Sequence, residues 1–281
     1  MGGRRPDGRV RRSRLDAELV RRGHARSRAE AAEFIAAGRV LVAGQVASKA
    51  STAVDPAVAL LVRDAEADPR WASRGAHKLI GALDAFGDVV VAGRRCLDAG
   101  ASTGGFTDVL LRRGAREVVA VDVGYGLLVW ALQSDDRVQV HDRTNVRHLT
   151  PEEIGGPVDL VVADLSFISL TLVLPALVAC ARADADLVPM VKPQFEVGKE
   201  RLGSGGVVRD PALRAEAVAT VVRAAGLLGW GTAGVVASPL PGPSGNVEFF
   251  VHLRRDIAVD DPFDDGRSAA LIAAAVERGP V

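Results

Sequence analysis

The sequence predicts two domains in series, a small α+β module followed by a larger α/β domain built on a mostly parallel sheet. Residues 13–62 contain two short helical stripes and then two short strand-like runs. From residue 94 onward, seven Val/Leu-rich runs alternate with helical stretches, which is typical of a parallel sheet buried on both faces. The last two runs, 232–240 and 246–253, are joined only by PGPSG. That connection is too short for a parallel crossover, so we expect the last strand to be reversed.

Composition places the chain among globular proteins and separates its two halves by charge. The 281 residues are 48% hydrophobic and 25% charged, with 35 basic and 35 acidic side chains. Residues 1–80 hold 16 basic and 9 acidic residues, a sum of +7, so the remaining 19 and 26 give −7. A basic front half suggests contact with a polyanion, although an ordinary arginine-rich surface would give the same sum.

Several protein classes are disfavoured by the sequence. Cys96 and Cys180 lie in apolar runs, as buried free thiols do, and no metal-ligand spacing is present. No apolar run is long enough for a transmembrane helix, and no hydrophobic segment of a signal peptide follows the N-terminus. We therefore expect a cytoplasmic protein without membrane or metal partners, whose residues 1–12 form a flexible basic arm.

The small module, residues 13–62, begins with two helical stripes. Leu15 and Leu19 mark the first helix, which we expect to end at Gly23. Ser27 is a suitable N-cap for a second helix, and Gly38 is expected to stop it. The runs RVLVAG and VALLVRD then predict two strands.

This module resembles an S4 domain, an RNA-binding module of ribosomal and RNA-modifying proteins. The resemblance rests on the run RLDAELVRRGHARSRAEAAEFIAAGRVLVAGQVASKAS, in which Ala43 stands where the family usually has Asn. Arginines cluster around the turn between the helices, where guanidinium groups can bind phosphates bidentately. A solvated helix pair is the alternative explanation of this face. We expect RNA contacts from Arg14, Arg21, Arg22, Arg26, Arg28 and Lys49.

Residues 63–77 are poor in apolar side chains and are predicted to be a linker. The larger domain is then expected to span residues 78–256, with a C-terminal extension over 257–281. Its seven strands with a reversed last strand are typical of a Rossmann-like methyltransferase domain. We expect Lys78 to lie just before the first helix of this domain.

A glycine-rich turn, LDAGASTGGFTDVLL, lies between the first strand and a helix at residues 97–111. Its glycines allow a tight turn and close approach to a ligand, but it is neither GxGxxG nor a P-loop. Asp98 at the first strand end suits an electropositive group such as the α-amine of S-adenosylmethionine. Asp122, at the end of the next strand, can accept both ribose hydroxyls of a nucleoside. A nucleotide-dependent oxidoreductase is the alternative.

Asp142 ends the third strand-like run and can lie near the adenine, with Asn145 close by; a capped turn would explain both residues equally well. Together these observations predict S-adenosylmethionine as the cofactor. The expected cofactor-binding residues are Asp98, Gly100, Ser102, Thr103, Gly104, Phe106, Asp122 and Asp142.

Lysine is rare in this chain, which makes its positions informative. Only four of the 35 basic residues are lysine, and Lys192 ends a buried strand in the run LVPMVKPQFE. Asp164 ends the neighbouring strand, at the switch point where substrates reach a cofactor. A lysine at a strand end can also simply extend its amine to solvent.

Lys78, Asp164, Lys192 and Glu248 resemble the catalytic tetrad of FtsJ-like RNA ribose 2′-O-methyltransferases. The motifs WASRGAHKL, ADLSFISL, VKPQFE and GGVVRD, behind an S4 module, are similar to the TlyA rRNA methyltransferases within that group. The resemblance covers roughly residues 13–254. It implies S-adenosylmethionine-dependent 2′-O-methylation of cytidine in ribosomal RNA, with ribosomal RNA or ribosomal subunits as partner and no obligate protein partner.

The chemistry agrees with lysine at these positions. A ribose hydroxyl must lose its proton as it attacks, and a desolvated lysine can serve as the base whereas arginine keeps its proton. We expect Lys192 to be the base or to orient the developing oxyanion, with Asp164 orienting both Lys192 and the hydroxyl. Lys78 and Glu248 are expected to fix the substrate ribose. The alternatives are a non-catalytic RNA-binding assembly factor and, because the family carries a haemolysin label, a membrane-lytic protein.

Overall fold

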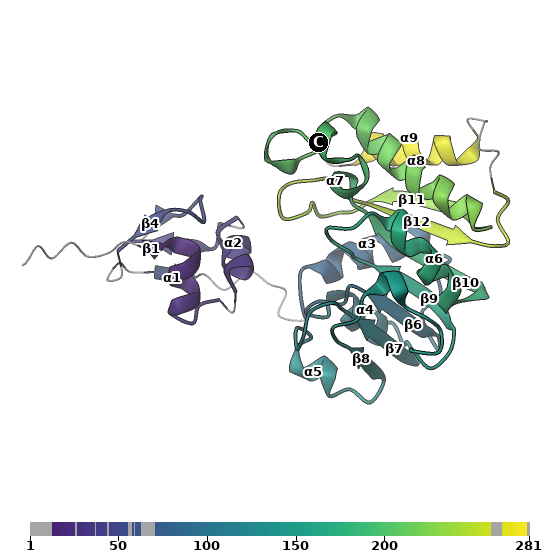
Figure 1. Ribbon diagram of the computed structural model, residues 1–281, viewed down its shortest axis with the longest axis horizontal. Coiled ribbons are helices and arrows are strands. Elements are labelled where there is room, and N and C mark those ends of the chain that lie inside the picture. Colours follow the sequence, from purple (N-terminus) through teal and green to yellow (C-terminus); the bar gives the residue numbers. More distant parts are fainter. Residues whose placement is uncertain are drawn as a thin grey trace, which may run out of the picture. The chain divides into compact units, whose positions relative to one another are not determined.

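The computed structural model divides into two compact units, Met1–Asp68 and Pro69–Val281 (Figure 1). It describes residues 13–25, 27–36, 38–43, 45–55, 58, 60–62, 71–259 and 266–279. The basic arm predicted over residues 1–12, most of the predicted linker, and Arg26 lie outside the described residues.

Two short helices form one side of the N-terminal unit. Helix α1 spans Leu15–Arg21 and α2 spans Arg28–Ala36. Gly23 follows α1 with a φ of 75°, a conformation that glycine adopts without steric cost. The Ser27 side chain accepts a hydrogen bond from the Glu30 N–H at 3.1 Å, as an N-cap does. Both predicted helix boundaries are therefore confirmed.

The rest of this unit consists of short strands. β1 (Ser13–Arg14) pairs with β4 (Ala53–Val54), and β2 (Val40–Val42) lies between β3 (Gln45–Val46) and β5 (Leu60–Val62). The runs predicted as strands correspond to β2 and β5. The other three strands have only two residues each, too few to produce a recognisable alternation in the sequence. The unit encloses a small core that includes Leu15, Leu19, Ala31, Ile35, Val40 and Val54.

A seven-stranded sheet forms the centre of the second unit, in the order β11-β12-β10-β9-β6-β7-β8. The strands β6 to β10 pair in parallel, whereas β12 is antiparallel to both β10 and β11. The predicted reversed last strand is confirmed, and it is inserted between two earlier strands. The strands are β6 Arg95–Ala99, β7 Glu117–Val121, β8 Val138–His141, β9 Val158–Ala163, β10 Ala181–Val191, β11 Gly231–Ala237 and β12 Phe249–Arg254.

Helices cover both faces of this sheet (Figure 1). One core includes residues from α3 (Gly75–Phe86), α4 (Gly105–Arg112) and α5 (Trp130–Gln133). The other includes residues from α6 (Leu170–Cys180), α8 (Pro211–Leu227) and α9 (Arg267–Arg278). Helix α9 lies in the predicted C-terminal extension and buries Ile272 and Ala275, so this helix completes the second core.

The start of the second unit differs from the expectation for Lys78. Helix α3 begins at Gly75, where the Ser73 hydroxyl accepts the Gly75 N–H at 3.2 Å, so Lys78 lies within the helix and not before it. The Ala72 N–H donates to Asp108 at 2.9 Å, and Trp71 packs on the α3–α4 core. Residues 71–77, which were expected to be linker, thus pack on this unit. Small and polar residues in WASRG concealed the helix start.

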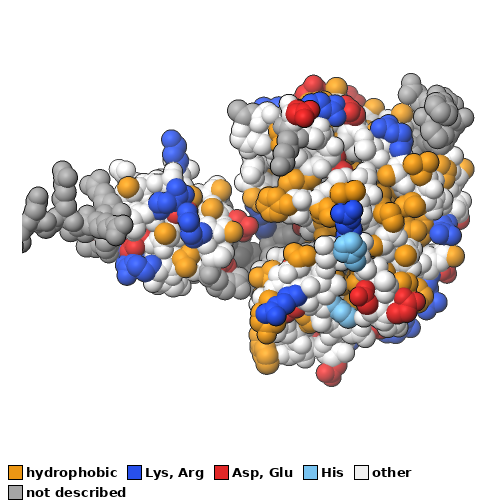
Figure 2. All heavy atoms as spheres, in the orientation of Figure 1, with side chains coloured by type: hydrophobic (Ala, Val, Ile, Leu, Met, Phe, Trp, Pro, Cys, Tyr) orange, Lys and Arg blue, Asp and Glu red, His pale blue; other side chains and the backbone are white. Residues whose placement is uncertain are grey.

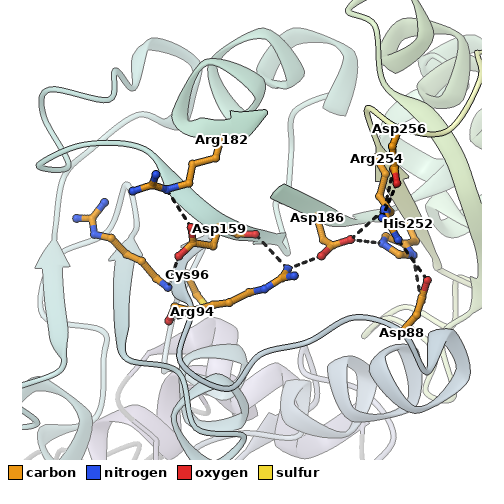
Figure 3. Close-up of polar contacts among 10 residues, drawn as sticks. Asp88, Arg94, Cys96, Asp159, Arg182, Asp186, His252, Arg254 and Asp256 are labelled. Atoms are coloured by element: carbon orange, nitrogen blue, oxygen red, sulfur yellow. Dashed lines mark hydrogen bonds and ion pairs between the residues drawn. The ribbon is translucent and has the colours of Figure 1, made fainter. Parts of the chain in front are cut away.

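A charged cluster lies at the edge of the sheet where β6, β9 and β10 begin (Figure 3). Buried Asp186 accepts hydrogen bonds from Arg94 and, at 2.7 Å, from the imidazole of buried His252. Arg182 pairs with Asp159 at 2.9 Å. These pairs connect β9, β10 and β12 at the edge opposite to the carboxyl ends of the parallel strands.

Candidate active site

The carboxyl edge of the sheet brings together three residues predicted for the site. Asp98 lies in β6, while Asp164 and Lys192 directly follow β9 and β10. β6 and β9 pair in register, and the Asp164 N–H donates to Ala99 O at 3.0 Å. A Cβ on Gly100 would lie 2.5 Å from the Asp164 carbonyl oxygen, so only glycine permits this approach of the two chain segments.

Lys192 and Asp164 form an ion pair at this edge. Lys192 Nζ lies 2.5 Å from Asp164 Oδ1 and donates a hydrogen bond to Ser166 Oγ at 2.9 Å. The Lys192 side chain is 9% exposed and that of Asp164 is 25% exposed. The carboxylate end of this pair is therefore the part that a substrate can reach.

Lys78 and Glu248 form a second and more enclosed pair. Lys78 Nζ donates to Glu248 Oε2 at 2.5 Å, and the two side chains are 6% and 0% exposed. Glu248 directly precedes β12, one residue before the strand in which it was expected. A carboxylate with no exposed surface cannot reach a ribose unless the site moves. In the described residues its partner is Lys78.

Asp98 is fully buried, and only one of its two carboxylate oxygens accepts a hydrogen bond from the described residues. Its Oδ2 accepts the Thr107 hydroxyl at 2.7 Å, whereas Oδ1 has no hydrogen-bond partner in the part of the chain that the structure describes. Burial raises the pKa of Asp98 to about 7; the Thr107 hydrogen bond opposes this shift, and the nearby charges of Asp164 and Asp122 add to it. The site therefore presents a buried acceptor that a cationic group would satisfy.

The glycine-rich turn is held to the next strand by Asp122. Asp122 Oδ2 accepts the Ser102 N–H at 2.8 Å and Oδ1 accepts the Gly124 N–H at 2.7 Å. Ser102 has a φ of 49°, and Gly104 has a φ of 99° where a Cβ would collide with Leu132. Each Asp122 oxygen keeps a second lone pair, so ribose hydroxyls can still bind.

Two of the predicted cofactor residues also have structural roles at the turn. The Phe106 side chain is 3% exposed and packs against Phe250 at a ring distance of 6.0 Å, so it belongs to the core. Thr103 contributes its carbonyl, which accepts the Val129 N–H at 3.3 Å. Because the Phe106 side chain lies in the core, only its backbone is left for the predicted contact with the cofactor.

Asp142 and Asn145 both make turn contacts. Asp142 Oδ2 accepts the Gly126 N–H at 2.9 Å, and Asn145 Oδ1 accepts the Arg147 N–H at 3.1 Å, capping a 3-10 helix at Val146–His148. Both residues therefore make contacts of the kind that the capped-turn alternative expected, and this contact of Asp142 engages only one of its two carboxylate oxygens.

Three residues around the Lys192–Asp164 pair were not predicted. Ser166 contacts Lys192 as described above, and Phe167 has a φ of 64° and is 91% exposed. Glu196 accepts hydrogen bonds from Ser169 Oγ at 2.5 Å and the Leu170 N–H at 2.8 Å, which joins the segments after β9 and β10. Burial raises the pKa of Glu196, and these two hydrogen bonds oppose the shift. All three lie in motifs recognised in the sequence, but their contacts are between segments distant along the chain.

Four of the arginines expected to contact RNA are paired with two carboxylates. Arg14 and Arg28 both lie 3.0 Å from Asp16, while Arg21 and Arg22 lie 2.5 and 2.8 Å from Glu18. Sequence reasoning counted these arginines as free cations and missed the acids that hold them. Lys49 is exposed, and its carbonyl accepts the Thr52 hydroxyl at 2.7 Å.

The fold and this edge define a class of protein: a methyltransferase-type α/β domain that carries paired lysines and acids and is joined to a small basic module. Within the described ranges, no cluster of three metal-binding side chains occurs, and no helix is both long and apolar enough to cross a membrane.

Comparison with known proteins identifies the family. The model of the FtsJ-like methyltransferase family matches residues 71–255, and that of the S4 domain matches residues 13–58. The chain is 66% identical over 245 residues to the 16S/23S rRNA (cytidine-2′-O)-methyltransferase TlyA of Mycobacterium tuberculosis, covering 87% of this chain and 91% of that protein. The chain therefore belongs to the FtsJ-like methyltransferase family, in the TlyA group that adds an S4 domain.

Two further relatives extend this comparison. The 23S rRNA (cytidine-2′-O)-methyltransferase TlyA of Campylobacter jejuni is 34% identical, over 65% of this chain and 70% of its own. A solved structure from Streptococcus thermophilus that bears the name hemolysin is 36% identical, with a TM-score of 0.71, over 95% of this chain and 97% of its own.

Proposed function

We propose that this protein transfers a methyl group from S-adenosylmethionine to the ribose 2′-hydroxyl of a cytidine in ribosomal RNA. The observation that carries the proposal is the pairing of two lysines with two acids beside a buried, half-satisfied aspartate. The relatives from Mycobacterium tuberculosis and Campylobacter jejuni, both named as rRNA cytidine-2′-O-methyltransferases, support the choice of substrate.

S-adenosylmethionine fits the residues at the carboxyl edge. Asp98 Oδ1, which has no hydrogen-bond partner among the described residues, suits its α-amine, and Asp122 suits its ribose hydroxyls. When bound, the cofactor supplies a methyl group on a sulfonium that leaves readily. Asp98, Asp122, Asp142 and the backbone of residues 100–106 would hold it.

The two lysine pairs would share the work of the methyl transfer. Lys192, with its partly exposed partner Asp164, would contact the 2′-hydroxyl and take its proton as the oxygen attacks. Glu248 would hold Lys78, and this enclosed pair would fix the first turn of α3 against the segment before β12. A lysine must lose its proton before it can act as a base, which arginine does not do in proteins.

RNA would be bound first through phosphates. Arg14, Arg21 and Arg28 have side chains that are 50–61% exposed, and each can bind a phosphate with its outward N–H groups. Arg22 is 20% exposed and also donates to Val58 O at 2.7 Å, which gives it a structural task. The target nucleotide would be turned out of its helix to reach the site. With ribosomal RNA as substrate, the protein would act in the cytoplasm.

Methyl transfer to purified ribosomal subunits tests this function. Subunits from cells that lack the gene would be incubated with the protein and labelled S-adenosylmethionine, and the modified ribose would then be mapped. We expect 2′-O-methylcytidine in RNA of one or both subunits, and none with Lys192→Ala. Cofactor binding without any transfer would instead support an RNA-binding assembly factor.

A further inference from the structure

Four arginines of the N-terminal unit are held in two pairs by buried acids. Asp16 is 4% exposed and Glu18 is 1% exposed, both in α1. Three of their four partners, Arg14, Arg21 and Arg28, are 50–61% exposed. Figure 2 shows several Lys and Arg side chains (blue) on the drawn face of this unit. Buried carboxylates thus lie beneath exposed arginine side chains, an arrangement that composition alone does not reveal.

Asp16 holds one pair by several hydrogen bonds. Arg14 donates to it through Nε and Nη2, each at 3.0 Å, and Arg28 donates through Nη2 at 3.0 Å and Nε at 3.3 Å. The Ala17 N–H adds a contact at 2.8 Å. One carboxylate therefore fixes a residue before α1 and the first residue of α2 in a single geometry.

Glu18 holds the other pair in the same way. Arg21 donates through Nε at 2.8 Å and Nη2 at 2.5 Å, Arg22 through Nε at 2.8 Å, and the Ser13 hydroxyl at 2.9 Å. Both acids stay ionised near neutral pH. Hydrogen bonds from Arg14, against the opposing effect of burial and together with Arg28, lower the pKa of Asp16 to about 2, and those from Arg21 and Arg22 lower the pKa of Glu18.

We propose that Asp16 and Glu18 are positioning residues for RNA: they hold the exposed arginines Arg14, Arg21 and Arg28 in a preformed arrangement for binding phosphates. The proposal rests on the RNA-binding role proposed above. Long side chains lose rotamer freedom when they bind, and a side chain already fixed loses less. The acids thereby favour binding of a polyanion although they carry the same charge as the polyanion.

The loss of charge and the loss of positioning predict opposite changes in RNA affinity, which makes the proposal testable. Asp16→Asn and Glu18→Gln each remove one negative charge with little change of shape. By charge alone, each variant should bind RNA more tightly and with an equal or steeper salt dependence. By positioning, each should bind RNA about tenfold more weakly, with a shallower salt dependence, because fewer phosphates are contacted at once.

Glu33→Gln is the matched control. Glu33 lies exposed in α2, and the described residues form no ion pair with it. This variant removes the same charge from the same unit without releasing an arginine. We expect it to bind ribosomal subunits as tightly as the wild type or slightly more tightly.

Affinity for purified ribosomal subunits would be measured over a salt series with the full-length variants. Hydrogen exchange of α1 and α2 amides would be followed in parallel. Weaker binding by Asp16→Asn and Glu18→Gln with unchanged exchange protection supports the proposal. Binding equal to that of Glu33→Gln overturns it, as does weaker binding that accompanies lost protection, since the acids would then only stabilise the fold. Loss of the RNA-binding role itself would appear separately, as unchanged affinity when Arg14, Arg21 and Arg28 are replaced by Ala.

Discussion

Lys78 Nζ and Glu248 Oε2 lie 2.5 Å apart although the two residues are separated by 170 positions in the chain. The contact joins α3, the first helix of the second unit, to the segment just before β12. It is also one of the most enclosed ion pairs of the described residues, with side chains 6% and 0% exposed. Its formation requires both ends of the second unit to be folded together.

Breaking this pair from one side should be costly. Lys78→Met leaves the Glu248 carboxylate buried without its counter-ion, and we expect a loss of about 3–5 kcal/mol of unfolding free energy. Lys78→Met with Glu248→Gln should lose clearly less than the sum of the two single variants. Urea unfolding followed by tryptophan fluorescence reports on this unit alone, since Trp71, Trp130 and Trp230 all belong to it. Additive losses would contradict the pairing.

Lys192→Arg should be nearly as inactive as Lys192→Ala. Arginine keeps the positive charge beside Asp164, but it is bulkier and retains its proton. Both variants should bind S-adenosylmethionine normally, because the proposed cofactor contacts come from β6, β7 and β8. Single-turnover methyl transfer at saturating cofactor is the measurement. Turnover near wild type by Lys192→Arg would eliminate the role as base.

Binding of S-adenosylmethionine should release a proton below about pH 7. The pKa of Asp98 is raised to about 7, chiefly by burial, so the free protein carries a neutral Asp98 below that pH. A bound ammonium group favours the carboxylate, so affinity should rise up to about tenfold per pH unit below pH 7 and level off above it. Calorimetry in two buffers of different ionisation enthalpy measures the proton release.

Asp98→Asn is the control for that titration. It should bind the cofactor more weakly, by roughly 1.5–3 kcal/mol, because a hydrogen bond to a charged group is lost. The dependence on pH below 7 should disappear with it. An identical pH profile in the variant would assign the titration to another group.

Asp186→Asn should destabilise the second unit at neutral pH. Burial of Asp186 opposes its ionisation, but hydrogen bonds from His252 and Arg94 outweigh that effect and lower the pKa. A lowered pKa means that Asp186 stabilises the fold above the ordinary pKa of about 3.9 and stops doing so as pH falls through the lower folded value. We expect a loss of about 3–5 kcal/mol at pH 7. The difference from wild type should narrow below about pH 4, as chemical unfolding at several pH values can show.

Ala43→Asn should stabilise the N-terminal unit. Ala43 has a φ of 48° at the turn after β2, where an L-residue with a Cβ is strained and Asn is tolerated better. The free energy of unfolding of this unit should rise by up to about 1 kcal/mol. Hydrogen exchange of β2 amides in the full-length protein measures it, and slower exchange is expected. Ala43→Val, with a β-branched side chain, should exchange faster than wild type.

The parallel sheet and its reversed strand could be predicted because each strand has a local signature in Val/Leu runs. The same holds for Asp98, Asp164 and Lys192, since a residue that ends a parallel strand must lie at the carboxyl edge. The start of α3 could not be predicted, because small and polar residues in WASRG do not show a helical period.

The partners of individual charged residues were also hidden. The sequence marks Arg14 and Arg28 as cations, but only the folded chain shows that Asp16 binds both. It marks Glu248 within a motif, but its enclosure depends on how closely the turn at Gly242 approaches, where a Cβ would lie 2.6 Å from Glu248 Oε1. Burial and pairing arise from tertiary packing, which periodicity does not encode.

The position of β12 between β10 and β11 has a consequence for folding of the chain during its synthesis on the ribosome. As the nascent chain emerges, β10 keeps an unpaired edge until the residues of β12, 249–254, have also emerged and can insert. Such an edge invites pairing with other chains, so a stalled or truncated chain would be prone to aggregate. The residue just before this strand, Glu248, pairs with Lys78, so the proposed catalytic set assembles late in translation. A nascent chain would thus be unable to methylate ribosomal RNA until most of the chain has been synthesised.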